Sequence, residues 1–171
     1  MNFAQLATLL ENKEHYTIYC DLDGVLVDLK KGVEDVTGTT IPSGGMNLMR
    51  QLVRLRRNPD IDMTEFFRNL QWTPDGERLW NFIKPYNPII LTGGSDGQDV
   101  NQGKNAWVAR NLGISPNDVI HDSNKQQYAK PYTILIDDLP SHAENFNRAG
   151  GLGILHTSAT NTISQLSEIL S

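Results

Sequence analysis

Short apolar runs alternate with amphipathic stretches along this chain, and the alternation predicts an α/β fold. Segments with helical spacing of apolar residues separate most of the apolar runs. Strands that alternate with helices predict a parallel sheet with right-handed crossovers. The runs that are short and apolar enough for strands of such a sheet are 16–20, 88–91, 119–121, 133–136 and 152–155.

Apolar residues three and four positions apart predict the helices. The first dozen residues carry apolar side chains at positions 3, 6, 9 and 10, which favours an amphipathic helix that packs on the domain. Further helices are expected from 25 onward, around 49–53, over 62–70, from 73 to 83, over 100–112, over 140–149 and at 163–170.

The stretch between the first two predicted strands is too long for an ordinary crossover, and helical patterns fill it. In its last helix, Thr73 and Pro74 are typical of an N-cap followed by proline at the first helical position. We therefore expect a Rossmann-like parallel sheet formed by 1–27 and 88–171. A small helical cap, 28–87, is inserted after the first strand.

Composition narrows the class of protein. At 171 residues, with 39% hydrophobic and 20% charged residues, the chain fits one soluble globular domain with a small insertion. A formal net charge of −5 argues against a general nucleic-acid binder. Cys20 is the sole cysteine, so no internal disulfide can form. No apolar run approaches the length of a membrane span or resembles a secretion signal, so we expect a cytoplasmic protein without a membrane partner.

Polar clusters follow three of the predicted strands. Asp21 and Asp23 occupy alternate positions after the first strand, so both project to the same side until Gly24 turns the chain. Thr92 follows the second strand, and Asp137 follows the strand at 133–136. Because the carboxyl ends of parallel strands meet at one edge, we expect these side chains to converge. A plain Asp-x-Asp-Gly turn is the alternative for the first cluster, but it does not explain the other two.

The residue types at these strand ends suit a divalent metal ion and a phosphate group. Mg²⁺ prefers hard oxygen ligands, which carboxylates from two strands and a backbone carbonyl supply. Thr92, Gly93 and Gly94 offer a hydroxyl group and backbone amides, the donors that phosphate oxygens accept. A lysine is expected to neutralise the remaining charge. No histidine has a metal-ligand spacing.

Four segments, in this order, resemble the four motifs of the haloacid dehalogenase superfamily: Asp21-Leu22-Asp23-Gly24-Val25, Leu91-Thr92-Gly93, a downstream lysine, and Ile136-Asp137-Asp138. The helical insertion and the segment Trp72-Thr73-Pro74-Asp75-Gly76 resemble the 5'(3')-deoxyribonucleotidases and related small nucleotidases of phages and bacteria. The resemblance implies an Mg²⁺-dependent phosphomonoesterase that hydrolyses nucleoside monophosphates through an aspartyl-phosphate intermediate. It also implies a bacterial cytoplasm, or that of a phage host, as the location.

The resemblance implies a role for each acid. Asp21 is the nucleophile, and Asp23 protonates the leaving oxygen and then activates water. The Asp21 carboxylate, the Asp23 backbone carbonyl and Asp137 bind Mg²⁺, and Asp138 supports these ligands from outside. The division is physically sound because a carboxylate against a metal stays ionised, whereas one further away can carry a proton.

Three lysines lie in the interval where the family keeps its lysine. Lys125 fits best, because it follows the third predicted strand in a loop and precedes Asp137 by 12 residues. Lys130 is the second choice, since Pro131 draws it into the start of the next strand. Lys104 shares a helical stripe with apolar residues, so it either snorkels to solvent or reaches the phosphate.

Aromatic residues of the predicted cap have two interpretations. Phe66 and Trp72 are candidates for a substrate pocket, since a base stacked on an aromatic ring is worth about 1–3 kcal/mol in single-strand binders. Their alternative is the core of the cap, which helical spacing favours for Phe66. Trp72 lies in a predicted loop and is the better pocket candidate.

Other functions remain compatible with the same acids. A sugar phosphatase or a polynucleotide 3'-phosphatase is the second interpretation, although an acidic chain without a basic stripe disfavours stable nucleic-acid binding. A non-catalytic phosphate-binding protein that kept the fold is the third, and the presence of both Asp21 and Asp23 argues against it. We expect a small phosphorylated substrate, in first place a nucleotide; the sequence specifies no oligomeric state.

Overall fold

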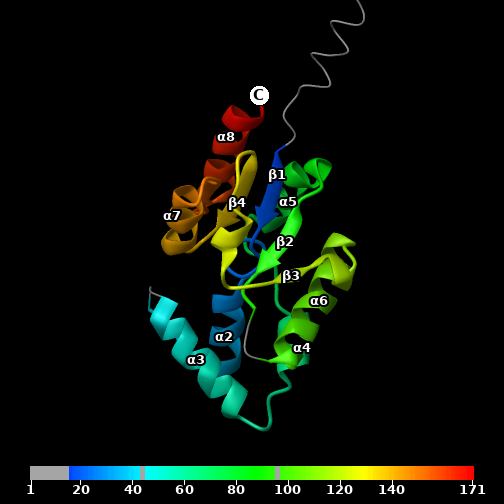
Figure 1. The fold of residues 1–171 in the computed structure, drawn as a ribbon. Coiled ribbons are helices and arrows are strands. Elements are labelled where there is room, and N and C mark those ends of the chain that lie inside the picture. The colour runs from blue at the N-terminus through cyan, green and yellow to red at the C-terminus, as the bar shows by residue number, and fades with distance from the viewer. Residues whose placement is uncertain (1–15, 43–44, 95–96) are drawn as a thin grey trace, which may run out of the picture.

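The computed structural model describes residues 16–42, 45–94 and 97–171. These residues form a five-stranded sheet in the order β3-β2-β1-β4-β5, and all neighbouring strands run parallel (Figure 1). The strands are β1 Thr17–Cys20, β2 Ile89–Thr92, β3 Ile120–His121, β4 Thr133–Asp137 and β5 Leu152–Leu155. The predicted fold class, a Rossmann-like parallel sheet with helices inserted after the first strand, is confirmed.

Helices connect the strands and form the insertion. They are α2 Leu29–Thr37, α3 Gly45–Arg57, α4 Met63–Arg68, α5 Gly76–Ile83, α6 Gln98–Leu112, α7 Pro140–Arg148 and α8 Ala159–Leu170. Short 3₁₀ helices lie at η1 Lys84–Tyr86, η2 Pro116–Asp118 and η3 Lys125–Tyr128. Within the described ranges, no helix is long and apolar enough to cross a membrane. The helix predicted for the first dozen residues lies outside the described residues.

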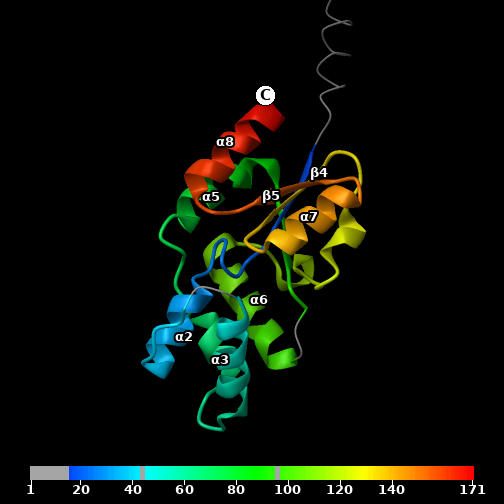
Figure 2. The ribbon, with the colours of Figure 1, turned by 90° about the vertical axis from the view of Figure 1, so that its left-hand side faces the viewer.

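The central strands β1 and β4 are buried on both faces. Alternate side chains of a strand point to opposite faces, so Ile18 and Ile134 join one apolar core with residues of α5, α6 and α8. Tyr19 and Leu135 join the other core, together with Phe146 of α7. Figure 2 views the molecule from the side that α7 covers. Apolar packing on both faces therefore holds the ends of β1 and β4, and with them the residues that follow these strands, in fixed positions.

The chain turns back directly after β1, before any helix begins. Gly24 has a φ of 78°, and its amide donates a hydrogen bond to the Val27 carbonyl oxygen at 2.8 Å. Glycine tolerates this left-handed conformation because it has no Cβ atom. The helix α2 begins only at Leu29. The prediction of helix from Val25 onward is therefore wrong for the residues before Leu29.

The start of α5 differs from the predicted cap. The Thr73 side chain donates to the Val25 carbonyl oxygen at 2.9 Å, so it does not cap the helix. The helix begins at Gly76, and the Asp75 carboxylate before it accepts a hydrogen bond from the Ala159 amide at 2.6 Å. The predicted N-cap at Thr73 is therefore wrong, because tertiary contacts use both polar side chains.

The helices α2, α3 and α4 lie beyond the carboxyl ends of the strands (Figure 1). The helix α4 packs along α6, and Gly103 permits their close approach. A Cβ atom there would lie 2.6 Å from the Thr64 carbonyl oxygen and 2.7 Å from the Phe67 Cβ atom. The helix α5 packs against α8. The limits of the cap, 28–87, stay a prediction.

Candidate active site

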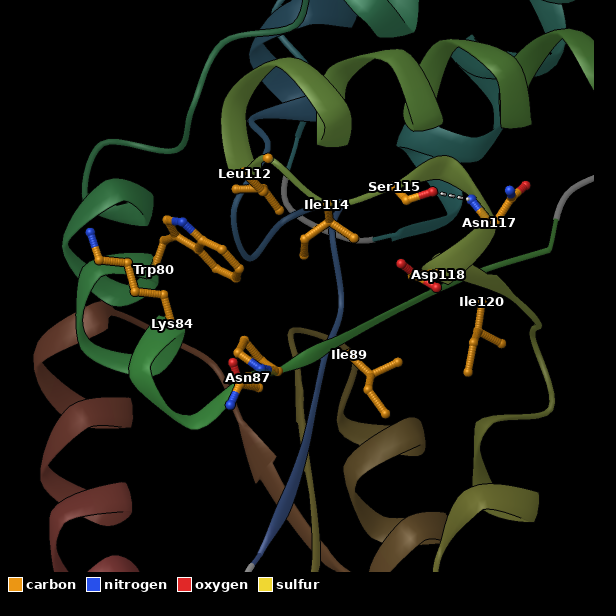
Figure 3. Close-up of a pocket in the computed structure, with 12 residues that line it drawn as sticks. Trp80, Lys84, Asn87, Ile89, Leu112, Ile114, Ser115, Asn117, Asp118 and Ile120 are labelled. Atoms are coloured by element: carbon orange, nitrogen blue, oxygen red, sulfur yellow. Dashed lines mark hydrogen bonds between the residues drawn. The ribbon is translucent and has the colours of Figure 1, made fainter.

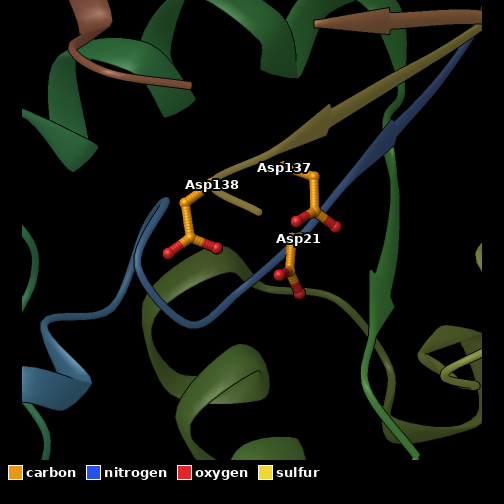
Figure 4. Close-up of side chains that lie close together, drawn as sticks. All are labelled: Asp21, Asp137 and Asp138. Atoms are coloured by element: carbon orange, nitrogen blue, oxygen red, sulfur yellow. The ribbon is translucent and has the colours of Figure 1, made fainter. Parts of the chain in front are cut away.

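The ends of β1 and β4 bring three carboxylates together. Cys20 and Ile136 are partners across the two strands, and the Asp21 amide donates to the Ile136 carbonyl oxygen at 2.9 Å. The carboxyl groups of Asp21, Asp137 and Asp138 consequently lie close together, as Figure 4 shows. One oxygen atom from each of the three lies within 4.8 Å of the other two.

Lys125 joins two of these carboxylates. Its Nζ atom lies 2.9 Å from Asp21 Oδ1 and 2.6 Å from Asp137 Oδ2, and its side chain is 1% exposed. Burial opposes the charged form of the lysine, but the attraction of Asp21 and Asp137 outweighs burial and raises the pKa of Lys125 above its ordinary value. The ammonium group therefore stays charged inside the site.

Asp137 is held by three hydrogen bonds. Its Oδ1 atom accepts from the Leu139 amide at 2.9 Å, and its Oδ2 atom accepts from Lys125 at 2.6 Å and from His142 Nδ1 at 2.9 Å. Burial favours the neutral acid, but the hydrogen bond from His142 and the charge of Lys125 outweigh burial and lower the pKa of Asp137. The sequence motifs did not predict His142 as a residue of the site. Its place five residues after Asp137, in the first turn of the next helix, was the one available signal.

Two other acids have a raised pKa. Burial raises the pKa of Asp21 to about 6, with repulsion from Asp137 and Asp23 added and the attraction of Lys125 opposing. Burial also raises the pKa of Asp138 to about 7, together with repulsion from Asp21 and Asp137. Negative charge is therefore in excess at this edge of the sheet.

The donor set fits a hard divalent cation. Carboxylate oxygens are the ligands that Mg²⁺ prefers, and Asp21, Asp137 and Asp138 can each direct one oxygen to a common point. One lysine does not balance three acids, so a dication would supply the charge that the cluster lacks. The sequence predicted Asp138 outside the ligand set, whereas its carboxylate is close enough to serve as a ligand too.

Gly24 leaves the space that Asp138 fills. A Cβ atom at position 24 would overlap the Asp138 carboxyl group. Glycine is therefore needed here twice, for the positive φ of the turn and for the position of the neighbouring acid.

Lys104 forms a second cluster beside the first. Its Nζ atom lies 2.6 Å from Asp23 Oδ2 and donates a hydrogen bond to Thr92 Oγ1 at 3.1 Å. Lys104 is 4% exposed and Lys125 is 1% exposed, so both lysines are buried. The structure brings two of the three candidate lysines to the same edge of the sheet.

Lys130 lies outside both clusters. It precedes β4 at the amino end of that strand, whereas Asp137 ends the strand. Its side chain is exposed. The roles of Lys125 and Lys104 stay predictions. Both lysines form ion pairs with acids of the site, whereas Lys130 lies at the opposite end of β4.

The loop after Thr92 passes close to β3. A Cβ atom at Gly94 would lie 2.8 Å from the His121 carbonyl oxygen, so only glycine fits without a shift of the backbone. The Ser123 hydroxyl group donates to the Gly94 carbonyl oxygen at 3.1 Å. A Cβ atom at Gly93 would meet only Ser123 Oγ, at 3.8 Å. Phosphate binding by Gly93 and Gly94 stays a prediction.

Trp72 and Phe66 are half-buried against other aromatic rings. The ring centroids of Trp72 and Trp107 are 4.8 Å apart, and those of Phe66 and Phe67 are 5.2 Å apart. Both residues pack against the larger apolar core. Contact of Trp72 or Phe66 with a substrate stays a prediction.

A cavity of about 850 Å³ lies near the amino end of β2, away from the carboxyl ends of the strands (Figure 3). Its lining includes Trp80, Ile89, Leu112 and Ile114. Ile89 begins β2, whereas Thr92 ends it, so this cavity lies at the amino end of the strand. It is separate from the acidic cluster.

No protein-family model matches the sequence, and no curated protein matches it either. Among solved structures, the chain is similar to a hydrolase from Streptococcus pneumoniae TIGR4, with a TM-score of 0.53 and 13% identity over 90% of this chain and 99% of that one. It is also similar to an L-2-haloacid dehalogenase from Xanthobacter autotrophicus, with a TM-score of 0.49 and 14% identity over 81% of this chain and 76% of that one. A HAD phosphatase from Thermococcus onnurineus gives a TM-score of 0.47 and 13% identity over 91% and 98% of the two chains.

At these identities the similarity concerns the fold alone, and the two TM-scores below 0.5 support no conclusion. The parallel sheet with helices inserted after β1 is nevertheless the core arrangement that the sequence resemblance implied, and the structure adds the strand order 3-2-1-4-5. The chain thus shares its overall fold with the Streptococcus pneumoniae hydrolase, and a buried site of acids and lysines lies at the carboxyl edge of its sheet.

Proposed function

We propose that this protein is an Mg²⁺-dependent phosphomonoesterase that hydrolyses nucleoside monophosphates through a phosphorylated Asp21. One observation carries the proposal: the two acids that follow β1 are held by different lysines. Asp21 contacts Lys125, and Asp23 contacts Lys104. Two carboxyl groups in different electrostatic surroundings suit two roles, one as nucleophile and the other as proton carrier.

Asp21 is the proposed nucleophile. The Leu22 amide donates to Asp21 Oδ1 at 2.7 Å, and Lys125 Nζ lies 2.9 Å from the same oxygen. Because both contacts engage Oδ1, Oδ2 is the oxygen that attacks. Its bond to phosphorus forms as the bond between phosphorus and the ester oxygen breaks.

Asp23 is the proposed acid and then the base. The departing ester oxygen takes a proton from the Asp23 carboxyl group and leaves as an alcohol. A water oxygen then attacks phosphorus while Asp23 accepts the proton of that water. The bond from phosphorus to Asp21 breaks, inorganic phosphate leaves, and both acids return to their starting states.

The remaining site residues are proposed to bind the phosphate group. Thr92 Oγ1 accepts a hydrogen bond from Lys104, so its own hydrogen is left to donate to a phosphate oxygen. The amides of Gly93 and Gly94 and the Lys125 ammonium group supply further donors and charge. Mg²⁺ held by the acids and the Asp23 carbonyl oxygen would neutralise charge on the phosphoryl group during transfer.

A nucleoside monophosphate is the proposed substrate because the motifs and the helical insertion resemble those of small nucleotidases. Helices α2, α3 and α4 of the insertion lie beyond the carboxyl ends of the strands (Figure 1), and we infer that they favour a small substrate over a polymer. The net charge of −5 also disfavours nucleic acid. Within the insertion, Trp72 is the first candidate for contact with the base.

The proposal is tested by phosphate release from nucleoside monophosphates in the presence of Mg²⁺. Asp21→Asn is expected to lower kcat by on the order of 10³-fold or more, because a nucleophile is lost. Lys130→Met changes an exposed lysine at the opposite edge and is expected to leave kcat unchanged. Full activity of Asp21→Asn would show that the mechanism is wrong.

The substrate is tested with a panel at equal concentration. It contains nucleoside 5'- and 3'-monophosphates with ribose or deoxyribose, sugar phosphates, and an oligonucleotide with a 3'-phosphate. We expect the highest kcat/KM with a nucleoside monophosphate. A higher value with a sugar phosphate or the oligonucleotide would replace the proposed substrate and leave the proposed chemistry in place.

A further inference from the structure

Lys104 is a second buried lysine in a site whose motifs require one. Lys125 already joins Asp21 and Asp137, and it is the lysine whose position in the sequence fits the resemblance best. Lys104 is 4% exposed and lies on α6, so it comes from another part of the chain. A buried ammonium group is costly unless it is paired and hydrogen-bonded. The contacts of Lys104 therefore require an explanation of their own.

Those contacts join the ends of two strands. The Lys104 Nζ atom lies 2.6 Å from Asp23 Oδ2, after β1, and 3.1 Å from Thr92 Oγ1, at the end of β2. It also lies 5.5 Å from the centroid of the Phe67 ring, which belongs to α4. A cation over an aromatic ring is stabilised by the electrons of the ring. The ammonium group is thus held from three sides.

The position of Lys104 is set by the packing of α6 against α4. Its neighbour Gly103 lies so close to α4 that an added Cβ atom would be 2.6 Å from the Thr64 carbonyl oxygen. The Thr64 hydroxyl group also donates to the Asp99 carbonyl oxygen of α6 at 3.1 Å. The backbone at Lys104 therefore has little freedom to move away from the site.

The two oxygens of the Asp23 carboxyl group have different surroundings. Oδ2 faces Lys104, whereas Oδ1 is buried and has no hydrogen-bond partner among the described residues. A buried polar atom without a partner is uncommon and costs free energy. Oδ1 is therefore the Asp23 oxygen whose hydrogen-bonding capacity no described residue uses. In the same way, the hydrogen bond from Lys104 to Thr92 leaves the hydroxyl hydrogen free to donate.

We propose that Lys104 is a positioning residue that orients the Asp23 carboxyl group toward the leaving oxygen and the Thr92 hydroxyl group toward the phosphate. This inference rests on the proposed function, because it assigns Lys104 a part in the same reaction. Lys104 acts through its two partners. Lys125 differs, because its partners are the nucleophile and an acid of the metal cluster.

The decisive experiment compares two substrates that differ in their need for a proton. An alkyl leaving group, as in a nucleoside monophosphate, departs only when its oxygen is protonated. The p-nitrophenolate group departs as an anion. The quantity to measure is kcat/KM, because it covers the steps up to the departure of the leaving group.

Lys104→Met is expected to lower kcat/KM for the nucleoside monophosphate by about 10²-fold, the lower end of what proton transfer contributes. The loss with p-nitrophenyl phosphate is expected to be about tenfold or less, since it reflects only weaker phosphate binding. Lys104→Gln, which keeps a neutral donor, replaces Lys104→Met if that variant does not fold, with the same difference between substrates expected. Lys130→Met is the matched control and should change neither value.

Equal losses with both substrates, or no loss with either, would overturn the role of Lys104. If the unchanged protein with Mg²⁺ hydrolyses neither substrate, the proposed function fails, and the role of Lys104 fails with it. A second measurement needs no activity and no metal. Lys104→Met should lower Tm less in an Asp23→Asn background than in the unchanged protein. In that background there is no Asp23 carboxylate for the loss of Lys104 to leave unpaired. If the losses in Tm of Lys104→Met and Asp23→Asn simply add in the double variant, the contact between Lys104 and Asp23 does not couple the two residues.

Discussion

Lys125 and Lys104 are both buried at the carboxyl edge of the sheet, but they connect different parts of the molecule. Lys125 joins β1 to β4 through Asp21 and Asp137, inside the core. Lys104 contacts Asp23 after β1 and reaches it from a helix that packs on α4 of the insertion. The first lysine balances charge around the proposed nucleophile. The second holds an acid in place and depends on the packing of the insertion.

The two pairs also differ in burial. The side chains of Asp21 and Asp137 are 8% and 0% exposed, whereas that of Asp23 is 22% exposed. Water can therefore compensate part of a lost contact at Asp23 but almost none at Asp137. Loss of Lys125 should consequently affect stability more than loss of Lys104.

The largest expected effect is that of Lys125→Met. It leaves Asp21 and Asp137 buried without their counter-charge, so the free energy of unfolding should fall by about 3–5 kcal/mol. Phosphatase activity should be lost as well. Urea denaturation at neutral pH in the presence of a chelator measures the change in stability.

Two lysine variants sharpen this comparison. Lys104→Met should cost about 1–3 kcal/mol, because it leaves one partly exposed acid without its partner. Lys130→Met removes an exposed lysine and should change the free energy of unfolding by less than about 0.5 kcal/mol. Equal costs for Lys125→Met and Lys104→Met would contradict the contrast between the two clusters.

An effect comparable to that of Lys104→Met is expected from pH and metal. The pKa of Asp138 is about 7 in the folded protein against an ordinary value of 3.8, so the folded state binds more protons than the unfolded chain between these values. Its contribution to stability is present below pH 4 and is lost as the pH rises through about 7. The stability advantage of Asp138→Asn over the unchanged metal-free protein should therefore grow by about 2–4 kcal/mol between pH 4 and pH 8.

Added Mg²⁺ should reverse this effect. The unchanged protein should gain stability at pH 8 when Mg²⁺ replaces the chelator, and Asp138→Asn should gain less, because a charged candidate ligand is gone. Thermal unfolding of both proteins across the pH range measures the difference. A stability difference that does not vary with pH would contradict the raised pKa of Asp138.

A further effect concerns the packing that supports Lys104, where the cost should be similar to that of Lys104→Met. Gly103→Ala places a methyl group 2.6 Å from the Thr64 carbonyl oxygen, so α6 and α4 must separate. Overpacking of this kind costs about 1–3 kcal/mol. Activity should fall more with a nucleoside monophosphate than with p-nitrophenyl phosphate, because Lys104 moves with Gly103.

Gly45→Ala is the matched control for that variant. A Cβ atom at Gly45 meets nothing within 4 Å, so stability and the ratio of the two activities should stay unchanged. Urea denaturation and kcat/KM with the two substrates provide the measurements. If Gly103→Ala behaves like Gly45→Ala, the position of Lys104 does not depend on the insertion.

The strand ends could be predicted because local patterns encode them. Apolar runs marked each strand, and Asp21, Thr92 and Asp137 followed three of these runs directly. In a parallel sheet every strand ends at the same edge, so the convergence of these residues required no knowledge of strand order. The fold class and the acids that cluster were therefore accessible before any coordinates.

Side-chain contacts that depend on how elements fold against one another were not accessible in this way. Thr73 has the local features of an N-cap, yet its hydroxyl group donates to Val25, which lies 48 residues earlier. His142 has no distinctive spacing, yet it donates to Asp137 once α7 folds back on β4. Both side chains are used by tertiary contacts that compete with the local pattern.

Hydrophobic periodicity and spacing along a strand specify the alternation of strands and helices and the positions of the acids, so both are encoded locally in the sequence. Which lysine contacts which acid depends on the packing of whole elements. Lys125 reaches Asp21 and Asp137 because η3 packs on α7 and places Tyr128 against Tyr19 of β1, and Lys104 reaches Asp23 because α6 packs closely on α4. Such distances depend on how whole elements pack, and pairing a buried charge is favourable only once that packing has removed water.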